Sequence, residues 1–165
     1  MRQVTSGAGL DEAAMARALA QLAALVKARG LNSSATRAEI ARAALSRRGH
    51  FSVEELATDL RARGAKDAHT ATVYRVLPLL VDAGLLQLTL VSGKSARYER
   101  AFEREHHDHL VCTGCGKIVE FEAEAVEALQ REIAARFGFL LTDHVHELRG
   151  VCADCRPGAR RRRAR

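Results

Sequence analysis

The sequence predicts an α+β protein, with an N-terminal winged helix-turn-helix domain and a small C-terminal α/β domain that contains a structural zinc site made of four cysteines. Three observations carry this prediction. Helical hydrophobic spacing fills the first half of the 165 residues, a period-two hairpin pattern follows, and the only four cysteines form two Cys-x-x-Cys motifs. We expect residues 1–101 to form the first domain, 102–106 a hinge linker and 107–155 the second domain.

Four helices are expected in the first half of the chain. The third should begin at Ser52, which has Glu55 three residues later at the spacing of a capping box. Glycines follow the ends of all four apolar patterns and serve as helix stops. The expected helices cover about residues 11–29, 35–48, 52–63 and 70–83.

A hairpin is expected directly after the fourth helix. Leu86, Leu88 and Leu90 recur at every second position, Ser92 to Lys94 forms a turn, and residues 96–102 make the return strand. In a winged helix-turn-helix domain, the helices are followed by a β-hairpin, as in this predicted order. The third and fourth helices would be the helix-turn-helix pair, and residues 86–101 the wing.

The fourth helix is a candidate DNA-recognition helix. Its apolar stripe leaves four side chains on other faces near the N-terminal end, namely Thr70, Thr72, Tyr74 and Arg75. Arg75 could bind phosphate or guanine, and Tyr74 could stack on a thymine methyl or reach phosphate. The alternative is an ordinary amphipathic helix whose polar residues face water.

The second half of the chain has the pattern of a small α/β unit. We expect strands near residues 107–111 and 117–121, a helix near 123–137 and a strand near 139–149. The motifs Cys112/Cys115 and Cys152/Cys155 bracket these elements, so one Zn²⁺ on four thiolates would staple the unit shut. Such a site is coordinatively closed and performs no catalysis. The alternative is a pair of redox-active Cys-x-x-Cys motifs.

A run of nitrogen and oxygen ligands precedes the first cysteine. On a strand, His106 and Asp108 would face one way, and His107 and His109 the other, so that one strand could serve two sites. Such ligands suit Fe²⁺, Mn²⁺ or Zn²⁺. The alternative is a solvated histidine tract. Further candidate ligands are His50, Glu99, Glu120, Glu127, His144 and His146.

Charge and composition narrow the class of protein. Six of the 26 basic residues lie in residues 156–165, and the other 20 balance 20 acidic residues, so the net charge of +6 sits in an Arg-rich tail expected to be disordered. The tail would attract phosphate or merely aid solubility.

No apolar run is long enough for a membrane span and no secretory signal is visible, which favours a cytoplasmic location. Neither HExxH nor GxSxG occurs, so we expect no enzyme, although a metal-dependent hydrolase or a zinc-held interaction module is an alternative.

Taken together, these residues resemble the ferric uptake regulator family of bacterial metal-sensing repressors. The resemblance spans about residues 30–155. The strings that carry it are residues 71–75 (ATVYR), 106–121 (HHDHLVCTGCGKIVEF), 127–137 (EALQREIAARF), 141–144 (LTDH) and 150–155 (GVCADC). It implies a homodimer whose C-terminal domain mediates dimerisation and whose winged helices bind an AT-rich palindromic operator on double-stranded DNA.

The resemblance also implies three metal positions. Structural Zn²⁺ would bind Cys112, Cys115, Cys152 and Cys155. A sensing site at the hinge would use His50, Glu99, His109 and Glu120, with His107 as a further candidate. A third site would use His106, Asp108, Glu127 and His144. Metal shared by the two domains would fix their orientation and so increase DNA affinity.

The signal that is sensed is expected to be iron. Relatives sense iron, zinc, manganese, nickel or peroxide, and peroxide sensors tend to carry Asp where this chain has Glu99 and Glu120. We therefore expect Fe²⁺ as the regulatory metal, replaceable by Mn²⁺ or Zn²⁺ in vitro. Two departures from the family pattern stand out. Asn32 replaces a basic residue that enters the minor groove, and the segment from Glu99 to His109 is about one residue longer than in some relatives.

Overall fold

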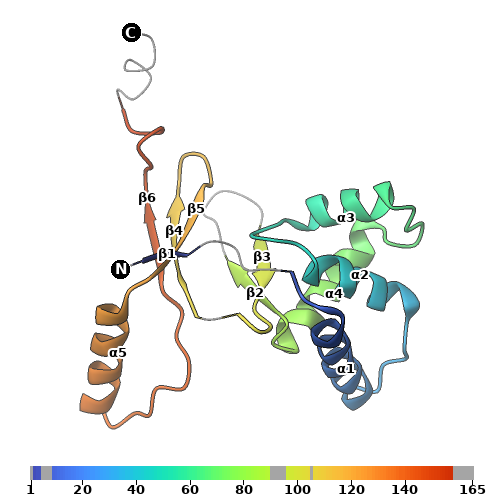
Figure 1. The fold of residues 1–165 in the computed structure, drawn as a ribbon, viewed down its shortest axis with the longest axis horizontal. Coiled ribbons are helices and arrows are strands. Elements are labelled where there is room, and N and C mark those ends of the chain that lie inside the picture. The colour runs from blue at the N-terminus through green and yellow to red at the C-terminus, as the bar shows by residue number, and fades with distance from the viewer. Residues whose placement is uncertain (1, 5–8, 90–95, 105, 158–165) are drawn as a thin grey trace. The chain divides into compact units, whose positions relative to one another are not determined.

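The computed structural model describes residues 2–4, 9–89, 96–104 and 106–157, and the chain divides into two compact units (Figure 1). The N-terminal unit contains residues 9–89 and 96–104. The C-terminal unit contains residues 106–157 together with residues 2–4. Residues 2–4, expected in the N-terminal domain, join the other unit.

Four helices build the N-terminal unit, and local capping signals start three of them. The side chains of Asp11, Ser34 and Ser52 each accept a hydrogen bond from the backbone N–H three residues later. At Ser52 the capping box predicted with Glu55 is confirmed, because the Glu55 carboxylate also accepts from the Ser52 N–H at 2.8 Å. The helices are α1 (Glu12–Ala28), α2 (Ala35–Leu45), α3 (Val53–Ala62) and α4 (Thr70–Asp82).

The winged helix-turn-helix predicted from the sequence is present. Helix α4 buries its apolar stripe, including Val73 and Leu77, in a core shared with α2 and α3. Strands β2 (Leu86–Thr89) and β3 (Arg97–Arg100) pair antiparallel and form the wing; the turn expected at residues 92–94 lies outside the described residues. Phe51 and Tyr98 exchange two backbone hydrogen bonds of 2.9 and 2.8 Å, which tie the wing to the loop before α3.

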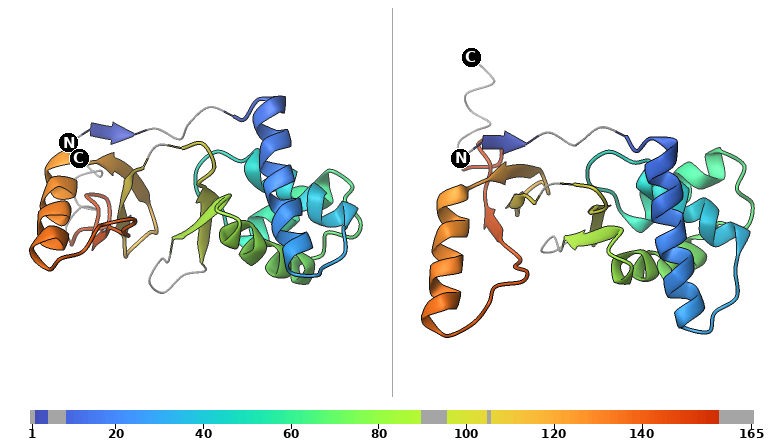
Figure 2. Two further views of the ribbon diagram at one scale, coloured as in Figure 1. Left: turned by 90° about the horizontal axis from the view of Figure 1, so that it is seen from below. Right: turned by 60° about the horizontal axis from the view of Figure 1, so that its bottom comes forward.

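A four-stranded sheet and one helix form the C-terminal unit. The strand order is β1-β5-β4-β6, with β1 (Arg2–Val4), β4 (Asp108–Cys112), β5 (Ile118–Glu122) and β6 (Glu147–Gly150). Helix α5 (Glu124–Arg136) lies beside the sheet in both views of Figure 2. Strand β1, for which the sequence carries no predictive pattern, pairs antiparallel with the edge of β5.

The strand expected over residues 139–149 is too long. Strand β6 begins only at Glu147, which lies opposite His109 in a parallel pair with β4. Residues 139–146 form no strand, although the His146 carbonyl still accepts from the His109 N–H of β4 at 3.3 Å. Val145 in this segment is 84% exposed. The Arg-rich tail lies outside the described residues from Gly158 onwards.

Candidate metal centres and DNA-binding surface

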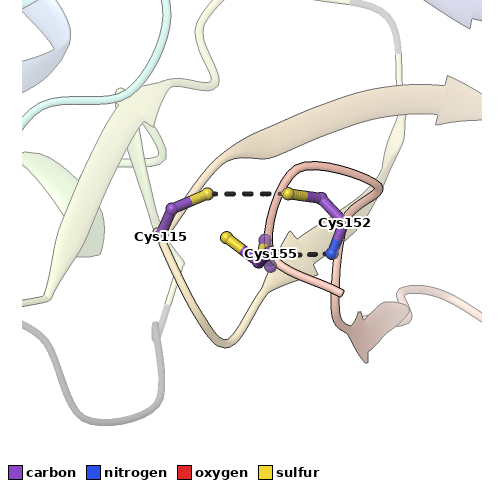
Figure 3. A group of neighbouring side chains, drawn as sticks. Cys115, Cys152 and Cys155 are labelled. Atoms are coloured by element: carbon purple, nitrogen blue, oxygen red, sulfur yellow. Dashed lines mark hydrogen bonds between the residues drawn. The ribbon is translucent and has the colours of Figure 1, made fainter. Parts of the chain in front are cut away.

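The four cysteine sulfurs form one cluster in the C-terminal unit. All four lie within 4.8 Å of one another, and the Cys115 and Cys152 sulfurs face each other at 3.8 Å (Figure 3). Four thiolates held tetrahedrally about 2.3 Å from Zn²⁺ are roughly 3.8 Å apart. All four cysteines are free thiols. Their donor set and spacing therefore fit a closed Zn²⁺ site.

A glycine allows the two Cys-x-x-Cys segments, residues 112–115 and 152–155, to approach each other closely. We call these segments the cysteine knuckles. A Cβ atom added at Gly114 would lie 3.0 Å from the Cβ and 3.1 Å from the sulfur of Cys155. No side chain fits there without moving the cysteine. The turn itself is closed by the Gly116 N–H, which donates to the Cys112 carbonyl at 2.9 Å. The turn from Cys112 to Cys115 thus places the sulfurs of both residues beside those of Cys152 and Cys155.

Hydrogen bonds within the cluster favour the thiolate form of Cys112 even without a metal ion. Backbone N–H donors lower the pKa of the Cys112 thiol to about 6, chiefly that of Cys152, whose nitrogen is 3.3 Å from the sulfur. The pKa of Cys155 is raised to about 12, first by its side-chain hydrogen bond with Cys152 and then by that with Cys115. One sulfur is therefore prepared as a metal ligand, while another holds its proton until a cation replaces it.

Two pairs of potential nitrogen and oxygen ligands lie at the start of β4, with His106 and His107 just before its first residue. On one side, His106 Nε2 lies 3.2 Å from Asp108 Oδ1. On the other, the His107 and His109 rings pack edge to face with centroids 5.0 Å apart. Both pairs are two residues apart, which is the spacing that places side chains on one face of a strand.

The first set forms a compact cluster of potential metal ligands. Donor atoms of His106, Asp108 and His144 all lie within 4.8 Å of one another. The His144 Nε2 atom is 3.9 Å from Asp108 Oδ1, and the Glu127 carboxylate on α5 is 4.0 Å from His106 Nε2. Cis ligands about 2.1 Å from one ion are roughly 3.0–3.5 Å apart, so small side-chain adjustments would suit a divalent cation. The structure brings together all four residues that the family resemblance implied for the third site.

Each unit holds part of the predicted sensing set. In the N-terminal unit, the bridge between Phe51 and Tyr98 sets His50 beside Glu99, with His50 Nε2 3.4 Å from Glu99 Oε1. In the C-terminal unit, His109 of β4 and Glu120 of β5 are directly opposite cross-strand partners. Both pairs combine one imidazole with one carboxylate, and all four residues are at least half-buried.

Sequence reasoning missed an ion pair at Glu99. The Arg104 guanidinium donates to Glu99 Oε2 at 2.7 Å, so the carboxylate has His50 against one oxygen and Arg104 against the other. The chain turns between Ala101 and Arg104, so Arg104 does not continue the strand that carries Glu99. Strand periodicity therefore could not predict that these two side chains meet.

The four predicted DNA-contact residues all lie at the N-terminal end of α4. Tyr74 and Arg75 are exposed, and Thr70 and Thr72 are half-buried. The Tyr74 hydroxyl donates to Glu54 of α3 at 2.7 Å, which raises the pKa of Tyr74 and lowers the pKa of Glu54. Glu54 would oppose a phosphate at this hydroxyl. The groups of this helix that suit contact with DNA are therefore the Tyr74 ring and the Arg75 guanidinium.

A winged helix-turn-helix joined to a unit with a four-cysteine cluster and a separate His/Asp/Glu cluster defines the class of metal-responsive DNA-binding regulators. Among the described residues, no helix is both long and apolar enough to cross a bilayer.

Comparison with known proteins gives the family. Residues 28–149 match the model of the ferric uptake regulator family, and this chain belongs to that family. The ferric uptake regulation protein of Escherichia coli K12 is 44% identical over 109 residues, which are 65% of this chain and 72% of the relative.

Two solved structures are similar along most of their length. The Helicobacter pylori ferric uptake regulator, described as having three functional metal-binding sites, matches with a TM-score of 0.76 and 29% identity, covering 90% of this chain and 97% of that one. The Francisella tularensis ferric uptake regulator with iron matches with a TM-score of 0.66 and 32% identity, covering 78% and 96%. This chain is accordingly a metal-responsive transcription regulator.

Proposed function

We propose that the protein is a non-catalytic repressor that binds DNA when Fe²⁺ is plentiful and thereby shuts off iron-uptake genes. The observation that carries this proposal is the division of metal donors. Thiolates are confined to the cysteine cluster, which suits structural zinc, while imidazole and carboxylate donors are paired separately in both units. The name of the family and the iron-bound relative support Fe²⁺ as the regulatory ion.

The proposed switch depends on two half-sites. His50 and Glu99 would donate from the DNA-binding unit, and His109 and Glu120, with His107 as a further candidate, from the other unit. A bound divalent ion supplies a link between these half-sites. Residues that ligate one ion together hold their two units in one relative orientation. DNA affinity rises when that orientation matches the operator, and linkage requires that operator binding strengthens metal binding equally.

The geometry of α5 supports a homodimer. None of the thirteen described residues of this helix is buried, and Leu129, Ile133 and Phe137 form an exposed apolar stripe at a spacing of four residues. We call these three residues the α5 stripe. An exposed apolar stripe on a helix marks a surface that another element covers. A second copy of the same helix would place two winged helices on the two halves of a palindrome, and we propose an AT-rich operator.

Cytoplasmic location completes the proposal. Four cysteines that must remain thiolates are compatible with a reducing compartment. The proposed DNA contacts are Thr70, Thr72, Tyr74 and Arg75, and the Arg-rich tail would add sequence-independent phosphate attraction.

Fluorescence anisotropy with an AT-rich palindromic duplex tests the proposal. The protein, loaded with structural zinc, is titrated onto DNA without added metal, with Fe²⁺ under anaerobic conditions, and with Mn²⁺ or Zn²⁺. We expect Fe²⁺ to tighten binding by about 5- to 150-fold, the usual span of allosteric coupling. His109→Ala should abolish this gain while keeping the metal-free affinity and the zinc content, which serve as its controls.

Two outcomes would contradict the proposal. DNA affinity that is the same with and without every metal would show a constitutive binder. A response to Zn²⁺ or Mn²⁺ at a free concentration at which Fe²⁺ gives none would show that the sensed metal is not iron.

A further inference from the structure

His146 stands against the carboxylate that organises the third cluster, although it is not one of the residues assigned to it. The His146 Nδ1 atom lies 3.0 Å from Asp108 Oδ2. The other carboxylate oxygen, Oδ1, faces His106 Nε2 at 3.2 Å and His144 Nε2 at 3.9 Å. The two oxygens of Asp108 are therefore divided. One points to the candidate metal ligands and the other to His146.

The fold fixes His146 in this place. The His146 carbonyl accepts from the His109 N–H at 3.3 Å, immediately before the parallel pairing of β6 with β4 begins. The ring meets Phe121 of β5 edge to face, with centroids 6.0 Å apart. Neighbouring strands thus hold both the backbone and the ring of His146.

Asp108 requires such a partner. Its side chain is 1% exposed, so water does not solvate the carboxylate, and an ion on Oδ1 leaves Oδ2 to be satisfied from within the protein. The Oδ2 and Nδ1 atoms are at ion-pair distance without the alignment of a hydrogen bond. A slight rotation of either group would complete that bond.

We infer that His146 is a positioning residue of the third metal site. It holds Asp108 by Oδ2 so that Oδ1 is presented to an ion shared with His106 and His144. It is not itself a ligand, because the donor atoms that lie within 4.8 Å of one another come from His106, Asp108 and His144. This inference rests on the proposed function insofar as that proposal includes a metal at the third cluster. Outer partners of this kind change metal affinity by about 10- to 100-fold.

Co²⁺ titration of the full chain tests the inference. The parent protein carries His109→Ala, which disables the proposed sensing site, and retains its structural zinc. Co²⁺ then reports on the third cluster through its visible absorption, and a competing chelator gives the affinity. His146→Ala should weaken Co²⁺ binding by about 10- to 100-fold. The absorption spectrum at saturation should stay that of the parent, because the ligands are the same.

Two further variants make the result specific. His146→Asn places an amide N–H where the Nδ1 atom of His146 stands, so it can donate to Asp108 and should recover most of the affinity. Val145→Ala changes the neighbouring exposed residue and should bind Co²⁺ like the parent. Zinc content and far-UV circular dichroism check that each variant is folded.

The possible failures are distinguishable. Co²⁺ affinity of His146→Ala within twofold of the parent would overturn the inference, and so would a changed spectrum at saturation, which would make His146 a ligand. Failure of His146→Asn to exceed His146→Ala would also overturn it. If the parent binds no Co²⁺ at all, the third metal site of the proposed function fails, and the positioning role fails with it.

Discussion

Ile133→Ala tests the α5 stripe as a dimer interface. Ile133 lies in the middle of the stripe and is 48% exposed in the single chain. The substitution removes three carbon groups from the proposed contact and keeps a residue with high helix propensity. The helix should therefore persist, and the loss should be confined to packing between the two copies.

The expected magnitude follows from that exposure. Removing three fully buried carbon groups costs about 2.4 kcal/mol at roughly 0.8 kcal/mol each. About half of the Ile133 surface is still exposed in the single chain, so the partner would account for about 1.2 kcal/mol per copy. A two-fold interface contains the substitution twice, which gives about 2.4 kcal/mol and a roughly 50-fold weaker dimer.

Sedimentation velocity over a dilution series measures this change in the dimer dissociation constant. Arg131→Ala is the matched control, because Arg131 lies on the opposite face of the same helix and its ion pair with Glu127 stays within α5. Zinc content should be equal in all three proteins. A dissociation constant for Ile133→Ala within twofold of the wild-type value would exclude the stripe from the interface.

Three further outcomes concern the DNA-binding surface and the cysteine cluster. Arg75→Ala should weaken operator binding and reduce the slope of log affinity against log salt by about one, as measured by anisotropy at several salt concentrations; an unaltered slope removes Arg75 from the phosphate contacts. Glu54→Gln should tighten DNA binding by about two- to fivefold, because it removes a negative charge beside Tyr74, and weaker binding in the same assay would show that Glu54 positions that side chain productively. Cys112→Ser should lose zinc and unfold the C-terminal unit, and a zinc-free variant that still melts cooperatively by circular dichroism would refute the staple.

Zinc affinity should also depend on pH in a definite way. Zinc displaces the Cys155 proton throughout the neutral range, because its pKa is about 12, so affinity rises with pH. Below about pH 6 the Cys112 thiolate becomes protonated too, and the slope of log affinity against pH should steepen by one proton. In the metal-free protein the lowered pKa of Cys112 contributes stability that is full above its ordinary value of 9.0 and is lost as pH falls through about 6. Chelator competition between pH 5 and 8 measures the slope, and an unchanged slope across pH 6 would contradict the lowered pKa.

Local signals in the sequence were sufficient for most of the helices and for the separation of the candidate metal ligands. The Ser52 capping box, the apolar stripe of α4 and the alternation of His106 to His109 all depend on residues within one turn or one strand. Such patterns are set by backbone geometry, which is the same in every fold. The cysteine knuckles belong with them, since two short motifs define four donors of one kind.

The sequence by itself determined the order of the elements after β1 and the chemistry of the donors. Only the tertiary structure decided which donors stand together and what holds them. The pairing of β6 with β4 begins at Glu147, which shortened the expected strand and set His146 against Asp108. The sequence likewise did not predict the pairing of β1 with β5 or the ion pair between Arg104 and Glu99. The physical reason is that strand register and chain reversal join residues far apart in sequence, and no local periodicity encodes such contacts.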